Sequence, residues 1–402
     1  MKNLYCSLLL MLTLMLPATV MARTPDYDNY EFIVDDIFYK IVNDTAVVTF
    51  QGFYSSSFFG GYGGDVIIPT TVTHEGKTYP VAMIDDNTFI RCYNLTSITI
   101  PESIIKIGHD AFYNCIGLTR VNITDLEAWF KINMESNPLV YAQHLYLNGT
   151  KVTEIIIPEF ITRIRNFAFE GCIDLTSVTI PNTVTSIGHY AFRNCTGLTS
   201  IVIPNSVTDI GMMVFEGCTG LTSVTLGNSV TAINSYAFSH CAGLTSIEIP
   251  ETVTTIGANV FMGCTGLTSI VIPDLVTEIG NGAFGNCTGL TSLTIGKSVT
   301  SIGTNAFNNT SLIETVTCKA TTPPSWGNMD MFTTNVFNHA PLHVPVGCER
   351  AYKADTNWGQ FSTIIGDIDN DNPLEYLKCD VNGDGEVNIA DVNKVIDTIL
   401  KY

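Results

Sequence analysis

Large apolar side chains recur along the chain at a fixed interval of 23 residues. Three residue types share this interval and keep one phase relative to one another. They are Phe169, Phe192, Phe215, Phe238, Phe261, Phe284 and Phe307; Leu175, Leu198, Leu221, Leu244, Leu267 and Leu290; and Cys172, Cys195, Cys218, Cys241, Cys264 and Cys287, with Phe89, Phe112, Cys92, Cys115, Leu95 and Leu118 upstream. Such a period predicts a solenoid, in which each coil buries its apolar face against its neighbours.

Each coil is expected to begin with a short strand and to return through a turn. In the coil 198–220, a run rich in β-branched residues places Ile201 and Ile203 at alternate positions, as in a strand with one buried face. Pro204 ends the strand because proline cannot donate to a β ladder. After a turn at Gly211 we expect a brief helical or 3₁₀ return. The predicted fold class is therefore a β-rich solenoid with a parallel β ladder and short helical or 3₁₀ returns.

The cysteine ladder allows two interpretations. Cysteines at this spacing could form a metal or redox site, but the period places them side by side in the core, where a free cysteine acts as a small apolar residue. Parallel side-chain directions in stacked coils disfavour disulfides between them. Cys318, Cys348 and Cys379 lie outside the ladder. Of these, Cys318 and Cys348 are a candidate disulfide pair.

Segments of a different character flank the repeats. Residues 1–22 combine Lys2, an apolar run from Leu8 to Leu16 and a small residue at Ala22, which is the layout of a secretory signal peptide. The run is too short to span a bilayer, so we expect no membrane insertion after cleavage. The predicted segments are an N-terminal β cap at 23–65, the solenoid at 66–317 with an enlarged turn near 124–157, a C-terminal cap at 318–366 with a strand at 342–345 and a helix at 349–354, a linker at 367–379 and a calcium-binding segment at 380–402.

Charge and motif content exclude several function classes. The chain has 38 acidic and 19 basic residues, for a net charge of −19. An acidic surface repels phosphate backbones, so nucleic acid is not an expected partner. Its 7 histidines are scattered, and no HExxH, GxSxG or P-loop motif occurs. The sequence therefore predicts a protein that is not an enzyme.

Aromatic residues outside the core positions are the candidate ligand-binding residues. They are Trp129, Phe130 and Tyr141 in the enlarged turn, and His189, Tyr190 and Tyr236 at the positions that follow the glycine in most coils. The aromatic residues of the enlarged turn either form a binding protrusion or fill the irregular core of a wider coil. The outward strand face repeats serine and threonine and lacks the aromatic and arginine anchors typical of tight interfaces, so we expect specificity elsewhere.

Oxygen-bearing side chains near the C-terminus have the spacing of a calcium loop. Positions 1, 3, 5, 9 and 12 are Asp380, Asn382, Asp384, Asn388 and Asp391, and the carbonyl of Glu386 supplies position 7. Gly385 stands at position 6, where such a loop turns sharply. An apolar pattern from Val392 to Leu400 predicts the helix that follows. The expected cofactor is Ca²⁺.

The repeat C-x-x-L-x-x-I-x-I-P-x-x-V-x-x-I-G-x-x-A-F-x-x resembles the BspA-like leucine-rich repeat family of bacterial surface proteins, from about Val66 to Thr317. The resemblance implies a secreted or cell-surface binding protein, similar to adhesins that bind extracellular proteins or cell-surface ligands. Family members carry a similar tryptophan-containing enlarged turn, which favours a structural role for Trp129.

The calcium loop is similar to the loops of dockerin modules, which dock onto cohesins. Ile389 and Ala390 stand where many dockerins carry a Ser/Thr pair used in recognition, so the resemblance is partial. The alternative function is a dockerin-type component of an extracellular polysaccharide-handling complex, with a cohesin-like module or a glycan as its partner.

Overall fold

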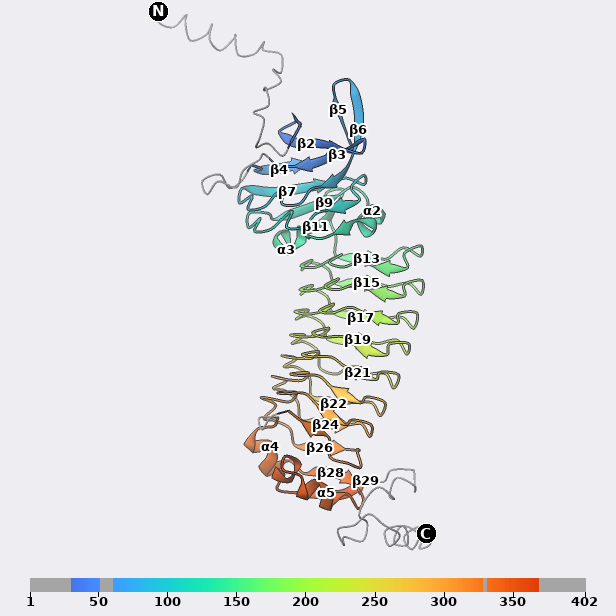
Figure 1. Ribbon diagram of the computed structural model, residues 1–402, viewed down its shortest axis with the longest axis vertical. Coiled ribbons are helices and arrows are strands. Elements are labelled where there is room, and N and C mark those ends of the chain that lie inside the picture. Colours follow the sequence, from blue (N-terminus) through green and yellow to red (C-terminus); the bar gives the residue numbers. More distant parts are fainter. Residues whose placement is uncertain (1–29, 51–60, 328–330, 369–402) are drawn as a thin grey trace, which may run out of the picture.

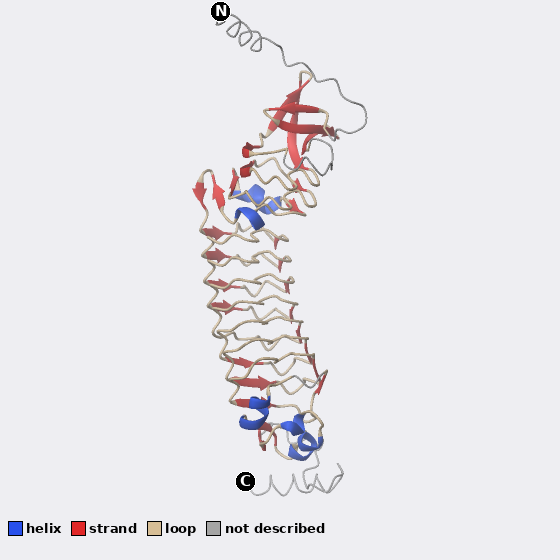
Figure 2. Cartoon of the chain, turned by 90° about the vertical axis from the view of Figure 1, so that its left-hand side faces the viewer, coloured by secondary structure: helices blue, strands red, loops and turns tan. Residues whose placement is uncertain are grey.

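The structure is a computed structural model, and it describes residues 30–50, 61–327 and 331–368. The chain forms an elongated, gently bent rod of stacked coils, as the 23-residue period predicts (Figure 1). Strands line two opposite edges of the rod, and turns connect them (Figure 2). The predicted signal peptide at 1–22 and the calcium-binding segment at 380–402 lie outside the described residues.

An antiparallel ribbon closes the N-terminal end of the rod. It consists of β1 (Phe32–Val34), β2 (Ile37–Val42) and β3 (Thr45–Thr49). β3 pairs in parallel with β6 (Lys77–Ile84), which also forms a hairpin with β5 (Thr71–His74). The ribbon therefore continues the coil ladder while its own side chains cover the first coil.

One edge of the rod, called the strand face below, carries the longer strands. These are β4 (Gly64–Ile67), β7 (Leu95–Ile100), β9 (Arg120–Ile123), β11 (Leu145–Leu147), β12 (Thr150–Lys151), β13 (Glu154–Ile156), β15 (Ser177–Thr179), β17 (Ser200–Val202), β19 (Ser223–Thr225), β22 (Ser269–Val271), β24 (Ser292–Ile295), β26 (Thr315–Cys318), β28 (Leu342–Pro345) and β29 (Ile364–Ile368). Their pairings are parallel except that β12 turns back antiparallel to β11. Alternate residues point outward, so that Ser200 and Val202 are exposed while Ile201 is buried.

The opposite edge carries two-residue strands in parallel register. They are β8 (Lys106–Ile107), β10 (Asn133–Met134), β14 (Arg163–Ile164), β16 (Ser186–Ile187), β18 (Asp209–Ile210), β20 (Ala232–Ile233), β21 (Thr255–Ile256), β23 (Glu278–Ile279), β25 (Ser301–Ile302) and β27 (Ser325–Trp326). The second residue of each strand is a buried isoleucine, except in β10 and β27, where it is Met134 and Trp326. The two ladders enclose the core between them.

The segment that leads each coil back to its next strand consists of consecutive turns. This corrects the expected helical or 3₁₀ return. Two residues per coil take the left-handed region, for example Tyr190 with φ 60° and Asn194 with φ 57°. A right-handed helix cannot pass through such residues. Their backbone groups bond to the next coil instead, as where the Tyr190 N–H donates to the Met212 carbonyl at 3.0 Å.

The helices in the described part of the chain lie where the repeat changes. The enlarged turn near 124–157, called the wide coil below, contains α2 (Leu126–Lys131) and α3 (Leu139–Ala142). The C-terminal end holds α4 (Thr334–His339), α5 (Glu349–Ala354) and the 3₁₀ helix η1 (Trp358–Gln360). The strand and helix expected in the C-terminal cap are found at 342–345 and 349–354.

Stacked phenylalanine rings form the centre of the core. From Phe169 to Phe332, neighbouring rings are nearly parallel, with centroids 5.3–5.7 Å apart. The cysteines are buried beside them, and the Cys195 thiol donates to the Phe169 carbonyl at 3.1 Å. Burial raises the pKa of the Cys218 thiol to about 12. The ladder cysteines therefore act as neutral packing groups, as the packing interpretation predicts.

The candidate bridge between Cys318 and Cys348 is wrong. Cys318 is a free, buried thiol that accepts a hydrogen bond from the Tyr352 hydroxyl at 3.2 Å. Cys348, by contrast, is disulfide-bonded. Cys318 is the last residue of β26, where alternate side chains point into the core. Its side chain is therefore buried and faces Tyr352.

Candidate binding surface

The strand face presents three rows of outward residues, and most of these residues are small. The threonine row includes Thr176, Thr199, Thr222, Thr245, Thr268 and Thr291; the serine row includes Ser177, Ser200, Ser223, Ser246, Ser269 and Ser292; and the variable row includes Thr179, Val202, Thr225, Glu248, Val271 and Thr294. The threonine row bonds to itself, because most of its hydroxyls donate to the threonine carbonyl one coil earlier, as from Thr222 to Thr199 at 3.1 Å. Equivalent bonds join Thr176, Thr199, Thr268 and Thr291 to the preceding coil. The row therefore stabilises the stack and leaves the serine row and the variable row for contacts with a partner.

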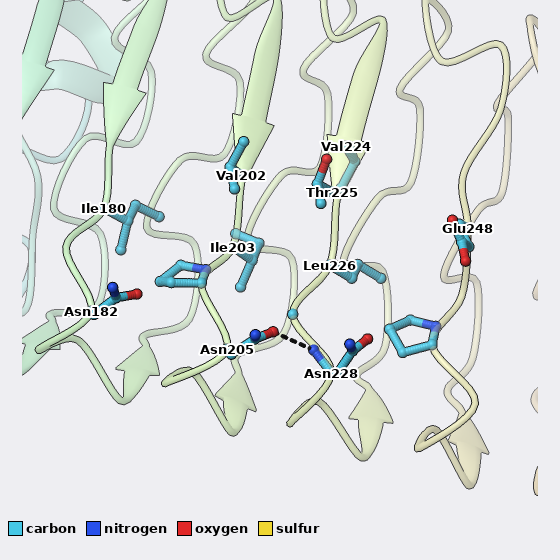
Figure 3. A pocket seen from close by; sticks show the side chains of 13 residues that line it. Ile180, Asn182, Val202, Ile203, Asn205, Val224, Thr225, Leu226, Asn228 and Glu248 are labelled. Atoms are coloured by element: carbon cyan, nitrogen blue, oxygen red, sulfur yellow. Dashed lines mark hydrogen bonds between the residues drawn. The ribbon is translucent and has the colours of Figure 1, made fainter.

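Two adjoining hollows form a groove along the ends of these strands. One hollow of about 610 Å³ and an adjoining one of about 650 Å³ share Asn228, Glu248 and Pro250 (Figure 3). Asn205 and Asn228 lie side by side in it, and the Asn205 side-chain oxygen accepts from the Asn228 N–H at 2.8 Å. The hollows lie where the strand ladder is interrupted between β19 and β22. At this place residues Ser246–Glu248 do not form a strand.

The turns that hold the two left-handed residues of each coil form another edge of the rod, called the turn edge below. It differs from the strand face because it carries large side chains on left-handed backbone. We call Phe167, Tyr190, Met213 and Tyr236 the turn-edge stripe; they occupy equivalent positions of four successive coils, with φ between 57° and 63°. In other coils the same position holds residues that tolerate this conformation: Asn87, Asp110, Asn259, Gly282 and Asn305. Left-handed backbone costs a bulky residue about 1–2 kcal/mol, so the stripe is held against a local preference.

Contacts within the stripe keep its rings in place. The Phe167 and Tyr190 rings stack with centroids 5.0 Å apart, and the Arg193 guanidinium lies 5.7 Å from the Tyr190 centroid. Arg193 also bonds to Glu216 at 2.7 Å and to Glu170 at 3.1 Å. Burial raises the pKa of the Glu170 carboxyl, against the opposing effect of Arg193. The stripe is thus a half-buried surface of aromatic and thioether groups, in which Phe167 and Tyr190 are held by these contacts.

The structure brings half of the predicted ligand-binding residues to this edge. Tyr190 and Tyr236 belong to the stripe, and His189 lies beside it, where its Nδ1 accepts from the Met212 N–H at 2.8 Å. Phe167 and Arg193 were missed by sequence reasoning. Phe167 could have been found, since it lies one period before Tyr190, but the role of Arg193 depends on contacts between coils.

The aromatic residues of the wide coil belong to the core. Trp129 and Phe130 are 2% and 3% exposed, and the Trp129 indole N–H donates to the Ala168 carbonyl at 2.9 Å. Tyr141 is half-buried against the same core. The rings of Trp129 and Phe130 are therefore not available to a partner as a binding protrusion, and these two residues fill the wider coil as the core-filling interpretation expects.

The predicted calcium ligands Asp380, Asn382, Asp384, Glu386, Asn388 and Asp391 lie outside the described residues. Within the described part, no cluster of three His, Cys, Asp or Glu residues has a metal-binding arrangement. Among the same residues, no helix has both the length and the apolar character needed to cross a bilayer. Calcium binding stays a prediction from the sequence.

Comparison with protein families matches the chain to the BspA type leucine-rich repeat region, at residues 80–133, 142–268 and 254–338. Among solved structures, a leucine-rich cell surface protein from Faecalibacterium prausnitzii is 26% identical, over 74% of this chain and 96% of that one, with a TM-score of 0.43. A leucine-rich repeat protein from Bacteroides ovatus is 25% identical, over 74% and 100%, with a TM-score of 0.29. The comparison with curated proteins gives no match.

Proposed function

Because the chain belongs to the BspA-type leucine-rich repeat family, we propose that it is an extracellular, adhesin-like protein that binds a protein ligand through the turn-edge stripe. The family match supports a non-catalytic binding role. The repeats act as a rigid scaffold, since successive coils are bonded through the turns, and along most of their length through one or both strand ladders.

The observation that carries this proposal is the strained conformation of the stripe. Four successive coils hold a large side chain where Asn, Asp or Gly would fit without strain. Backbone strain of this kind persists where the surrounding structure holds it, and it concentrates at binding sites. Tyrosine and arginine are also the residues most enriched among the energetic anchors of protein interfaces. The stripe combines both features on one exposed edge.

The test is a comparison of two triple variants of the full mature chain. Tyr190→Asn, Met213→Asn and Tyr236→Asn replace stripe residues by one that suits left-handed backbone. The relieved strain, about 1–2 kcal/mol per residue, offsets the lost side-chain contacts, so stability should not fall more than about 1 kcal/mol below that of the parent. Val202→Thr, Thr225→Ser and Val271→Thr change the strand face instead. Against a panel of extracellular matrix proteins, the first variant should bind at least tenfold more weakly and the second should bind as the parent does. Equal binding by parent and stripe variant would exclude this edge as the interface.

We propose further that the loop at Asp380–Asp391 binds one Ca²⁺ and serves as a C-terminal attachment point. Its support is the ligand spacing in the sequence, with Gly385 at the turn. Isothermal titration of the full chain with CaCl₂ should show one site, and Asp380→Ala with Asp384→Ala should abolish it. If chelation leaves capture by every cohesin-like or cell-wall partner unchanged, the attachment role is wrong even where calcium binds.

A further inference from the structure

A cluster of cationic and aromatic side chains lies on the strand face at the wide coil. Arg120 is the first residue of β9, Tyr146 lies on the neighbouring strand β11, and Lys151 is opposite Tyr146 on β12. The Arg120 guanidinium is 5.4 Å from the Tyr146 ring centroid, and the Lys151 ammonium is 6.0 Å from it. β9 and β11 lie next to each other near the upper part of the rod (Figure 1). Two positively charged side chains, Arg120 and Lys151, therefore lie near one tyrosine ring on a protein whose net charge is negative.

The charges of this cluster are only partly neutralised from within. Lys151 pairs with Asp174 at 3.2 Å, and His144 pairs with the same carboxylate. In the described part of the chain, Arg120 has no ion pair. The carboxylate nearest along its row, Asp65, is engaged by the hydroxyls of Ser97 and Thr96, which lower its pKa, with a smaller contribution from Arg120. Arg120 thus keeps its fork of donors for an external anion.

An unsatisfied amide lies beside these cations. Asn122 is two residues after Arg120 on β9, and it is the register partner of Tyr146. Its side-chain oxygen is buried and has no hydrogen-bond partner. Buried polar atoms are nearly always bonded, so this amide gains a bond if it turns outward to a ligand hydroxyl. An anion with neighbouring hydroxyl groups would therefore satisfy both Arg120 and Asn122.

We propose that Arg120, Tyr146 and Lys151, with Asn122, form a binding site for the sulfate or carboxylate group of an acidic saccharide. Arginine and lysine supply charge-assisted hydrogen bonds to the anion, and the tyrosine edge and the amide suit a sugar ring with its hydroxyls. An acidic peptide fits less well, because the two hollows described on the strand face, which could hold its apolar anchors, lie further along the rod and away from this cluster. The site is separate from the turn-edge stripe, so it stands or falls independently of the proposed protein ligand.

The experiment measures binding of four soluble probes of matched length to the full mature chain. They are a sulfated oligosaccharide, an unsulfated uronic-acid oligosaccharide, a neutral oligosaccharide and oligoglutamate. Binding of the sulfated or the uronic-acid probe, but not of the neutral one, is the expected result, and the stronger of the two identifies the anion. Affinity for it should fall as salt rises. Equal binding of oligoglutamate would overturn the saccharide assignment, and no binding of either acidic sugar would overturn the site.

Paired variants separate this site from general charge effects. Arg120→Gln with Lys151→Gln should weaken binding at least tenfold, and Tyr146→Leu should weaken it several-fold. Arg165→Gln with Lys297→Gln removes the same charge from exposed positions elsewhere and should change binding less than threefold. Thermal melts establish that each variant folds. If both charge pairs lose binding equally, attraction is non-specific and the site is wrong. The stripe variant should keep full saccharide binding, so failure of one proposal is distinguishable from failure of the other.

Discussion

Adding one methyl group at Gly220 tests how tightly the coils are stacked. A Cβ at this position would lie 2.3 Å from the Thr196 carbonyl oxygen of the preceding coil. Normal carbon–oxygen contact requires about 1 Å more, and the coils cannot separate freely because the Thr222 N–H donates to the Thr199 carbonyl at 2.9 Å. Overpacking costs about 1–3 kcal/mol, and each lengthened hydrogen bond adds about 0.5–1.5 kcal/mol. We therefore expect Gly220→Ala to lower the free energy of unfolding by about 2–4 kcal/mol.

Guanidinium unfolding of the mature chain, followed by circular dichroism, measures this loss. Gly243→Ala is the graded comparison, since its Cβ would lie 2.7 Å from the Thr219 oxygen and should cost less. Gly61→Ala is the matched control, because its Cβ would meet nothing within 4 Å and should leave stability within about 0.5 kcal/mol. A Gly220→Ala midpoint equal to that of Gly61→Ala would refute the close stacking of coils.

Three further outcomes follow from the core and the turn edge. Burial raises the pKa of the Cys218 thiol from the usual 9.0 to about 12. Because the unfolded chain releases this proton first, the contribution of the thiol to stability is complete below about pH 9 and is lost as the pH rises toward 12. Iodoacetamide at pH 8 should label the ladder cysteines only after denaturation, and labelling of the native protein would contradict this. Trp129→Ala should cost about 3–5 kcal/mol in denaturant unfolding without weakening ligand binding by the folded fraction, whereas a selective loss of binding would show that the ring reaches the partner. Asn259→Tyr should extend the turn-edge stripe by one coil and lower stability by about 1 kcal/mol, because Asn259 has φ 56°; unchanged stability would show that this position carries no strain.

The period predicted the parts of the fold that depend on burial alone. A residue that recurs every 23 positions must face the same environment in every coil, so the inward phenylalanine, leucine and cysteine ladders followed from their spacing. The helical return was wrong because left-handed residues such as Tyr190 are not recognisable from hydrophobic pattern: only the asparagine or glycine at equivalent positions hints at them. The Arg120–Tyr146 contact escaped prediction because it depends on the register of a hairpin that interrupts the period.

The same constraint determines where a repeat protein can evolve a binding site. A substitution at an inward position of one coil disturbs the packing of the two neighbouring coils. A side chain that points outward contacts mainly solvent or a ligand, so it can change with less effect on the stack. Yet most outward positions on the strand face are small, because threonine hydroxyls there bond from coil to coil. Aromatic side chains in contact with arginine therefore occur at the turn edge and in the wide coil, although single large residues such as Ile67 are also exposed on the strand face. In the turn edge they accept backbone strain, and in the wide coil they depend on an inserted hairpin. That both places hold Tyr–Arg contacts, at Tyr190 with Arg193 and at Tyr146 with Arg120, is the pattern expected if binding is selected where the repeat allows it.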